Sequence, residues 1–145
     1  MSKFTRVQIL EIAKTSRNLV KANLTDLDLS GADLREANLR DSNLSGSNLQ
    51  QANLHLADLR DANLRDSNLT KATLTYANLR DADLSNANLS RVDLRYANLE
   101  GADMESARNT AKLTVDNLRQ SRYNQDTKWP LGFNLLGSGT VLLED

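Results

Sequence analysis

A large apolar residue recurs at every fifth position along most of this chain. From Leu19 to Met104 the spacing is unbroken and gives 18 units, 17 centred on Leu and one on Met104. The residue before the centre is Asn or Asp in 17 units, and the residue two before it is Ala or Ser in 15. Residues 17–106 therefore form one tandem repeat, and repeats of this kind determine the fold.

A period of five excludes both a regular helix and a straight strand. In an α-helix each step of five turns about 140° net, so the leucines would spiral around the axis. In a strand an odd step sends successive leucines to opposite faces. The chain must therefore turn once per unit, and four units with right-angle corners close a square coil. Such coils stack about 4.8 Å apart through parallel backbone hydrogen bonds.

The same geometry predicts the core. Within a unit the central Leu and the small residue two before it share the inner face, while the Asn or Asp between them points outward. Side chains of Asn and Asp suit corners because they bond nearby backbone groups. One inner wall is expected to consist of Leu24, Leu44, Leu64, Leu84 and Met104. Burying each Leu contributes roughly 1.5–3 kcal/mol.

These units resemble those of a known family. Units such as Ala52-Asn53-Leu54-His55-Leu56 and Ala82-Asp83-Leu84-Ser85-Asn86 are similar to the A(D/N)Lxx units of pentapeptide-repeat proteins. The resemblance implies an all-β solenoid, a right-handed quadrilateral β-helix of about four and a half coils (18 units, four to a coil). The handedness comes from the resemblance alone. The stretch 123–133 is also similar to the tails of many cyanobacterial members.

The open ends of a repeat array need covers. Thr5 and Gln8 have capping-box spacing, and Phe4 and Ile9 are placed as a hydrophobic staple. This predicts a capping helix over about residues 6–16, within an N-terminal segment 1–16. The side chains expected to face the first coil are Val7, Leu10 and Ala13.

The C-terminal segment 107–145 is predicted to cover the other end. Thr114 can cap a short helix over about 115–122 with Val115 and Leu118 inward. The side chains expected to follow as a lid over the last coil are Trp129, Phe133, Leu135 and Leu136. A docking role for this aromatic loop stays open beside the role of a lid.

Stacking of successive coils turns the variable positions into surface columns. Arg40, Arg60 and Arg80 form one column, flanked by Asp41, Asp61 and Asp81. The aspartates offset the repulsion between the stacked arginines, which favours a solvated face whose charges compensate each other. The alternative is that this column is a strip that binds a partner. A second column consists of Leu56, Tyr76 and Tyr96, beside His55, Thr75 and Arg95.

The second column supplies the candidate site. Aromatic ladders stabilise sheets, so a purely structural role is one interpretation and a protein-binding patch is the other. The candidate protein-binding residues are Leu56, Tyr76, Tyr96, His55 and Arg95.

Composition and charge narrow the function. Leu, Asn, Ala and Asp make up 72 of the 145 residues, cysteine is absent, and the formal net charge is -1. This balance lacks the basic excess of nucleic-acid-binding proteins. No apolar run is long enough to span a membrane, and Glu11, Lys14 and Arg17 argue against a signal peptide. We therefore expect a cytoplasmic protein, a monomer or weak homodimer, without direct nucleic-acid or membrane binding.

Catalytic chemistry has little support. His55 is the sole histidine, and the aspartates follow the repeat. No catalytic, cofactor-binding or metal-binding residue is predicted. The leading hypothesis is a non-enzymatic scaffold or protein–protein interaction module with an unknown protein partner. Family members that protect DNA topoisomerases suggest an alternative, a DNA mimic. Residues 17–106 carry 14 acidic and 10 basic residues, and their most regular Asp column lies beside Arg, which weighs against that alternative.

Overall fold

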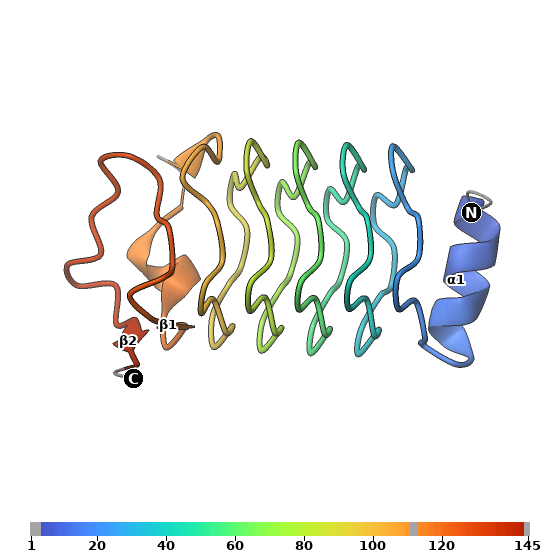
Figure 1. The fold of residues 1–145 in the computed structure, drawn as a ribbon, viewed down its shortest axis with the longest axis horizontal. Coiled ribbons are helices and arrows are strands. Elements are labelled where there is room, and N and C mark those ends of the chain that lie inside the picture. Colours follow the sequence, from blue (N-terminus) through green and yellow to red (C-terminus); the bar gives the residue numbers. More distant parts are fainter. Residues whose placement is uncertain (1–3, 111–112, 144–145) are drawn as a thin grey trace.

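The chain forms an elongated stack of coils with its two termini at opposite ends (Figure 1). The structure, a computed structural model, describes residues 4–110 and 113–143. Its regular elements are helix α1 (Arg6–Lys14), the 3₁₀ helix η2 (Val115–Leu118), and strands β1 (Arg122–Tyr123) and β2 (Val141–Leu142). Helix α1 lies against the first coil, and the other elements lie at the far end (Figure 1).

Each repeat unit pairs in parallel with the equivalent unit of the next coil, four units further on. Single-residue bridges run from Asn18↔Asn38 to Asn88↔Arg108. In each rung two backbone bonds form: the Asn38 N–H donates to the Arg17 carbonyl at 2.8 Å, and the Leu19 N–H donates to the Asn38 carbonyl at 2.8 Å. The four-unit register predicted from the period of five is therefore observed.

Each unit turns a corner immediately after its central apolar residue. The Ala57 N–H, for example, donates to the Leu54 carbonyl at 3.0 Å, and the intervening Leu56 has a φ of 60°. This left-handed third residue is what a type II turn requires. The Asn53 Oδ1 accepts a hydrogen bond from the His55 N–H at 3.1 Å, as expected for Asn at a corner.

The interior is a narrow column of aliphatic side chains. The predicted inner wall is fully buried, each of its members having 0% exposure: Leu24, Leu44, Leu64, Leu84 and Met104. Serine replaces alanine at some of the small interior positions. The hydroxyl oxygens of Ser42, Ser47 and Ser67 are buried and have no hydrogen-bond partner among the described residues.

Helix α1 begins at the predicted capping box. The Thr5 N–H donates to Gln8 Oε1 at 2.8 Å, and the Gln8 N–H donates to Thr5 Oγ1 at 3.3 Å. The helix ends at Lys14, earlier than expected, because the chain turns into the first coil at Arg17, whose φ is 55°.

The predicted inner face of α1 needs one correction. Ile9 and Ala13 are buried and Leu10 packs partly buried against the core, whereas Val7 is 76% exposed. The prediction for Val7 is wrong because the stripe that contains Ile9 and Ala13, one helical turn apart, lies on a different side of the helix.

The parallel pairing continues beyond the last unit recognised in the sequence. After Arg108 the chain leaves the stack and then re-enters it, because the Leu94 N–H donates to the Asn117 carbonyl at 2.8 Å. The Tyr96 N–H donates to the Arg119 carbonyl at 3.0 Å, and a further bridge joins Asp103 to Lys128. Residues 117–128 thus extend three walls of the solenoid.

This re-entry explains why the helix predicted over 115–122 begins after Thr114 as expected but ends early. Only Val115–Leu118 is helical, and as a 3₁₀ turn. The carbonyls of Asn117 and Arg119 accept from the preceding coil and are unavailable for an α-helix. Leu118 is buried as expected, while the side chain of Val115 lies outside the described part of the structure.

Most of the side chains expected in the aromatic lid lie against the core. Trp129, Phe133 and Leu135 pack partly buried against the core, and the Trp129 and Phe133 rings stack with centroids 5.7 Å apart. Leu136 is 85% exposed, so its predicted covering role is wrong. Leu131 in the same loop is fully exposed.

Candidate functional site

The three apolar side chains of the candidate site lie on successive coils and point into solvent. Leu56 is 49% exposed, Tyr76 is 51% and Tyr96 is 41%. All three occupy the left-handed corner position, with φ between 60° and 61°. That conformation costs a non-glycine residue about 1–2 kcal/mol. We call the column of Leu56, Tyr76 and Tyr96 the tyrosine wall.

The rings of the tyrosine wall hold each other in place. Tyr76 and Tyr96 stack with centroids 4.6 Å apart and an angle of 5° between their planes. His55 meets Tyr76 edge-on at 5.8 Å, and its Nδ1 lies 2.6 Å from Thr75 Oγ1. The facing surfaces of the two rings cover each other, while both residues stay partly exposed to solvent.

Arg95 lies beside the wall and is fixed by an aspartate. Its Nε and Nη2 donate to the two carboxylate oxygens of Asp93 at 2.8 and 2.6 Å. This bidentate bond raises the pKa of Arg95 above its ordinary value. The guanidinium is thus a stationary group at the edge of the wall, able to receive an acceptor from a partner through its remaining N–H donors.

Sequence reasoning missed Arg119 as a neighbour of the site. The Tyr96 N–H donates to the Arg119 carbonyl, just as the Tyr76 N–H donates to the Arg95 carbonyl. Arg119 therefore follows Arg95 in the stack. Together they line a shallow depression with Asp93, Asp116 and Asn117. The sequence signal that could have revealed this neighbour is the Asn117-Leu118 pair. It has the Asn-Leu pattern of a repeat unit but does not fall on the five-residue spacing.

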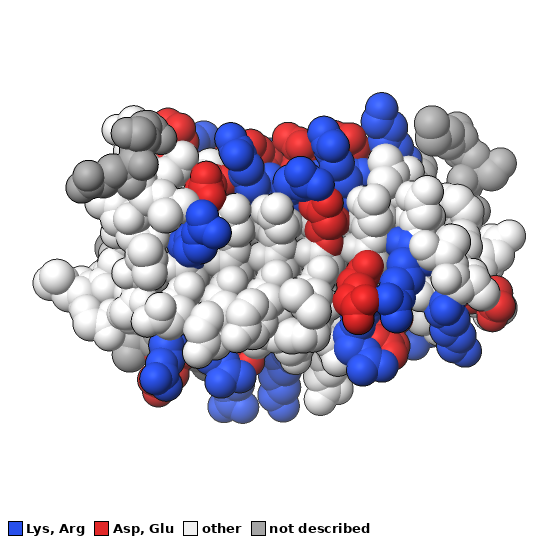
Figure 2. Space-filling model, turned by 90° about the horizontal axis from the view of Figure 1, so that it is seen from below, with Lys and Arg blue, Asp and Glu red and all other residues white. Residues whose placement is uncertain are grey.

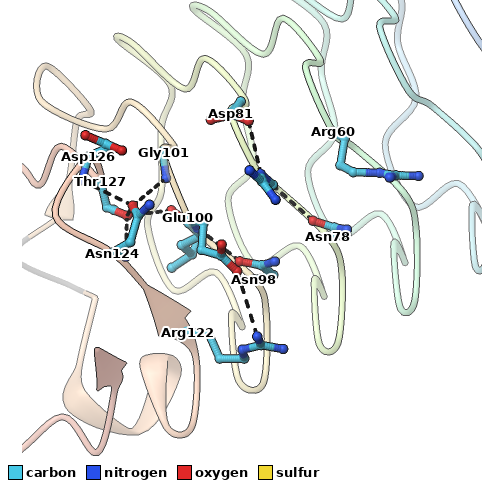
Figure 3. A network of polar contacts seen from close by, with 12 residues as sticks. Arg60, Asn78, Asp81, Asn98, Glu100, Gly101, Arg122, Asn124, Asp126 and Thr127 are labelled. Atoms are coloured by element: carbon cyan, nitrogen blue, oxygen red, sulfur yellow. Dashed lines mark hydrogen bonds and ion pairs between the residues drawn. The ribbon is translucent and has the colours of Figure 1, made fainter. Parts of the chain in front are cut away.

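The neighbouring charged column pairs with its flanking aspartates as predicted at Arg40 and Arg80, whereas Arg60 pairs with Asp58 in place of Asp61. Arg60 makes a bidentate contact with Asp58, with Nη2 and Oδ2 2.5 Å apart. Hydrogen bonds from Arg60 lower the pKa of Asp58. Arg80 pairs with Asp81 at 3.3 Å, and Arg40 with Asp41 at 3.7 Å. Figure 3 shows Asp81 and Asn78, which bond the side chain and the backbone N–H of Arg80 respectively.

Charges are unevenly distributed over the face of the rod that Figure 2 shows. Figure 2 shows one face on which acidic and basic groups gather along the long margins and in a mixed group toward the end that carries α1, while much of the rest is uncharged. Along the margins the two signs are mixed, with no unbroken acidic band visible on this face (Figure 2).

The C-terminal segment is tied to the fifth coil by polar contacts. Asn124 Oδ1 accepts from the Gly101 N–H at 3.0 Å (Figure 3), and Thr127 Oγ1 donates to the Leu99 carbonyl at 2.8 Å. Arg122 lies 3.9 Å from Glu100. These bonds hold the re-entrant segment in register with the rod.

The described residues offer little for cofactor chemistry. Within residues 4–110 and 113–143 no cluster of three or more His, Cys, Asp or Glu is arranged to hold a metal ion. Over the same ranges no helix is long and apolar enough to cross a bilayer.

A solenoid of four-unit coils with a buried leucine at the centre of each five-residue unit defines a class of repeat protein. The family model for pentapeptide repeats matches residues 18–55, 37–75, 52–91 and 74–108, which together cover more than half of the chain. The chain belongs to the pentapeptide-repeat family, and its solenoid is a right-handed β-helix. Proteins of this family are generally structural or interaction modules without enzymatic activity.

Solved structures include other pentapeptide-repeat proteins. A pentapeptide repeat protein from the thylakoid lumen of Arabidopsis thaliana is 44% identical over 55% of this chain, with a TM-score of 0.55. The match spans 55% of the Arabidopsis chain. A pentapeptide repeat protein from the cyanobacterium Nostoc is 28% identical over 99% of both chains, with a TM-score of 0.45.

A more distant structure belongs to a resistance protein. Trypsin-treated QnrB1, a plasmid-mediated fluoroquinolone resistance protein, is 14% identical over 86% of this chain and 83% of its own, with a TM-score of 0.48. At this level of likeness nothing about function is carried over. No curated protein sequence matches the chain significantly.

Proposed function

We propose that the chain is a non-enzymatic interaction module that binds a protein partner through the tyrosine wall. The observation that carries the proposal is an outward apolar column on three successive coils, with exposures of 49%, 51% and 41%. Aromatic side chains are enriched among residues that dominate protein–protein binding energy. His55 and Arg95 add polar contacts at the edge of the same surface.

The rest of the molecule serves as a rigid support for this wall. In our proposal segment 17–106 forms about four and a half coils, segment 1–16 covers one end, and segment 107–145 covers the other. The backbone bonds between coils hold Tyr76 and Tyr96 in place before binding. A pre-organised wall loses little conformational entropy when a partner docks. The module is proposed to act in the cytoplasm as a monomer or weak homodimer.

The arrangement of charges supports protein binding over DNA mimicry. A mimic needs continuous rows of free carboxylates to imitate phosphates. Here Asp58, Asp81 and Asp41 each lie within 4 Å of an arginine nitrogen, at 2.5, 3.3 and 3.7 Å. The proposed module therefore presents an uncharged wall flanked by paired charges.

The test compares Tyr76→Ser with Asp61→Asn in binding to a partner captured from the source cell. We expect Tyr76→Ser to weaken binding by roughly tenfold or more, as for truncation of an interface hot spot. Asp61→Asn should bind like the wild type. Melting temperatures of both variants check that folding is retained.

Two outcomes would contradict the proposal. Loss of binding by Asp61→Asn alone, with inhibition of a topoisomerase by the wild type, would favour the DNA mimic. Unchanged binding by both variants would make the wall a stabilising ladder and move attention to the loop around Trp129.

A further inference from the structure

The first coil has backbone carbonyls that no earlier coil can bond. Within the stack, carbonyls of each unit accept hydrogen bonds from N–H groups of the preceding coil. For example, the Leu29 N–H donates to the Asn48 carbonyl at 2.8 Å, and the Gly31 N–H donates to the Gln50 carbonyl at 2.8 Å. The equivalent acceptors on the first coil of this wall are the carbonyls of Asp28 and Ser30. Helix α1 lies on this side of the first coil (Figure 1).

Both of these carbonyls are bonded by a single side chain of α1. Arg6 Nη1 donates to the Asp28 carbonyl at 2.6 Å, and Arg6 Nη2 donates to the Ser30 carbonyl at 2.8 Å. The contact with the Asp28 carboxylate is much longer, at 4.0 Å. The main role of Arg6 is therefore to bond the backbone edge, and its ion pair is secondary.

The chemistry of arginine fits this edge. A guanidinium holds its N–H donors in a rigid planar fork, so two of them can meet two carbonyls that project from the same edge of a strand. Ile9 and Ala13, about one and two helical turns further on, are buried against the core. Because residues at these spacings lie on one side of a helix, the packing of α1 aims Arg6 at the edge.

We propose that Arg6 replaces the two N–H donors of a missing coil and so closes this wall against strand addition by a second copy of the chain. An open β-edge with unpaired acceptors is a template for another chain. Addition at the end of a solenoid is head-to-tail and continues without closure, which produces open-ended assemblies. A charged arginine that already bonds both carbonyls blocks that route.

The experiment uses the full chain with Arg6→Gln, Arg6→Lys and the matched control Lys14→Gln, which removes the same charge from an exposed position of α1. Sedimentation should show wild type and Lys14→Gln at the monomer mass of 16.1 kDa. Arg6→Gln should show an average mass that rises with concentration. Arg6→Lys keeps the charge without the fork, so it should associate to an intermediate degree.

A second measurement separates edge bonding from general damage to α1. The peptide groups after Asp28 and Ser30 include the N–H groups of Leu29 and Gly31, whose NMR shifts respond to the partner of each carbonyl. Both shifts should move in Arg6→Gln and in Arg6→Lys, and neither should move in Lys14→Gln.

The proposal is overturned if Arg6→Gln sediments like Lys14→Gln at every concentration, or if both amide shifts stay unchanged. If Arg6→Gln fails to fold, Arg6→Lys decides: monomeric behaviour like that of the wild type would also overturn it.

Discussion

At the scale of single residues, the small residue two before each central leucine is buried whether it is alanine or serine. A serine at this position packs like alanine but also buries a hydroxyl group that needs a hydrogen bond. Most units place alanine there, and Ala62 is 1% exposed. Ser67, in the next unit, is fully buried, and its hydroxyl has no partner among the described residues. The sequence predicted that these positions point inward, because a residue two before the central leucine shares its face. It could not predict that the hydroxyl would go unbonded, since that depends on the carbonyls within its reach.

This difference leads to a stability prediction. Ser67→Ala removes an unsatisfied buried hydroxyl and keeps the Cβ atom, so the free energy of unfolding should rise by about 1 kcal/mol. The reverse change, Ala62→Ser, should lower it by a similar amount. Urea unfolding of the two variants and the wild type measures both effects. A Ser67→Ala variant that is less stable than the wild type would show that the hydroxyl has a partner in solution.

At the scale of elements, the sequence predicted what the five-residue period and capping chemistry determine. The coil register and the start of α1 at Arg6 both follow from local patterns. The re-entrant segment could not be predicted in this way because the period is interrupted. In the regular repeat the Leu79 N–H donates to the Asn98 carbonyl. An equal separation along the sequence would pair the Leu94 N–H with the carbonyl of Leu113. The Leu94 N–H donates instead to the carbonyl of Asn117. This displacement hides the unit from a search at fixed period.

The candidate site was predictable only in part, for the same reason. The exposure of the Leu56, Tyr76 and Tyr96 column follows from the stacking of successive coils, and the structure places these side chains outward as expected. The bidentate bond between Arg95 and Asp93 depends on side-chain conformation, and the nearness of Arg119 depends on the re-entry. Neither can be read from the spacing of repeats.

The re-entrant segment makes its own prediction. Leu118 has 0% exposure at the centre of the resumed unit, whereas Leu131 is 100% exposed in the loop that follows. Leu118→Ala should lower the free energy of unfolding by roughly 2–5 kcal/mol, as for other buried leucines. The matched variant Leu131→Ala should leave it nearly unchanged. Equal effects of the two substitutions would mean that residues 117–128 do not continue the core in solution.

At the scale of the whole molecule, the interior of the rod uses nearly the same residues in every unit, whereas the residues at the corners vary from unit to unit. The buried leucines fix the coil, so the corner positions are free to carry a surface pattern. On one corner that pattern is the tyrosine wall, and on the next it is a column of paired arginine and aspartate. The central claim is that the tyrosine wall is where a protein partner docks.

The most direct test is photo-crosslinking from single corners of the same rod. A photoreactive amino acid replaces Tyr76 in one variant and Asp66, two corners away around the coil, in the other. We expect a discrete adduct with one cellular protein from position 76 alone. Unlabelled wild type should compete for this adduct, and unlabelled Tyr96→Ser should compete poorly. Equal adducts from positions 66 and 76, or equal competition by wild type and Tyr96→Ser, would contradict the claim that the wall binds the partner.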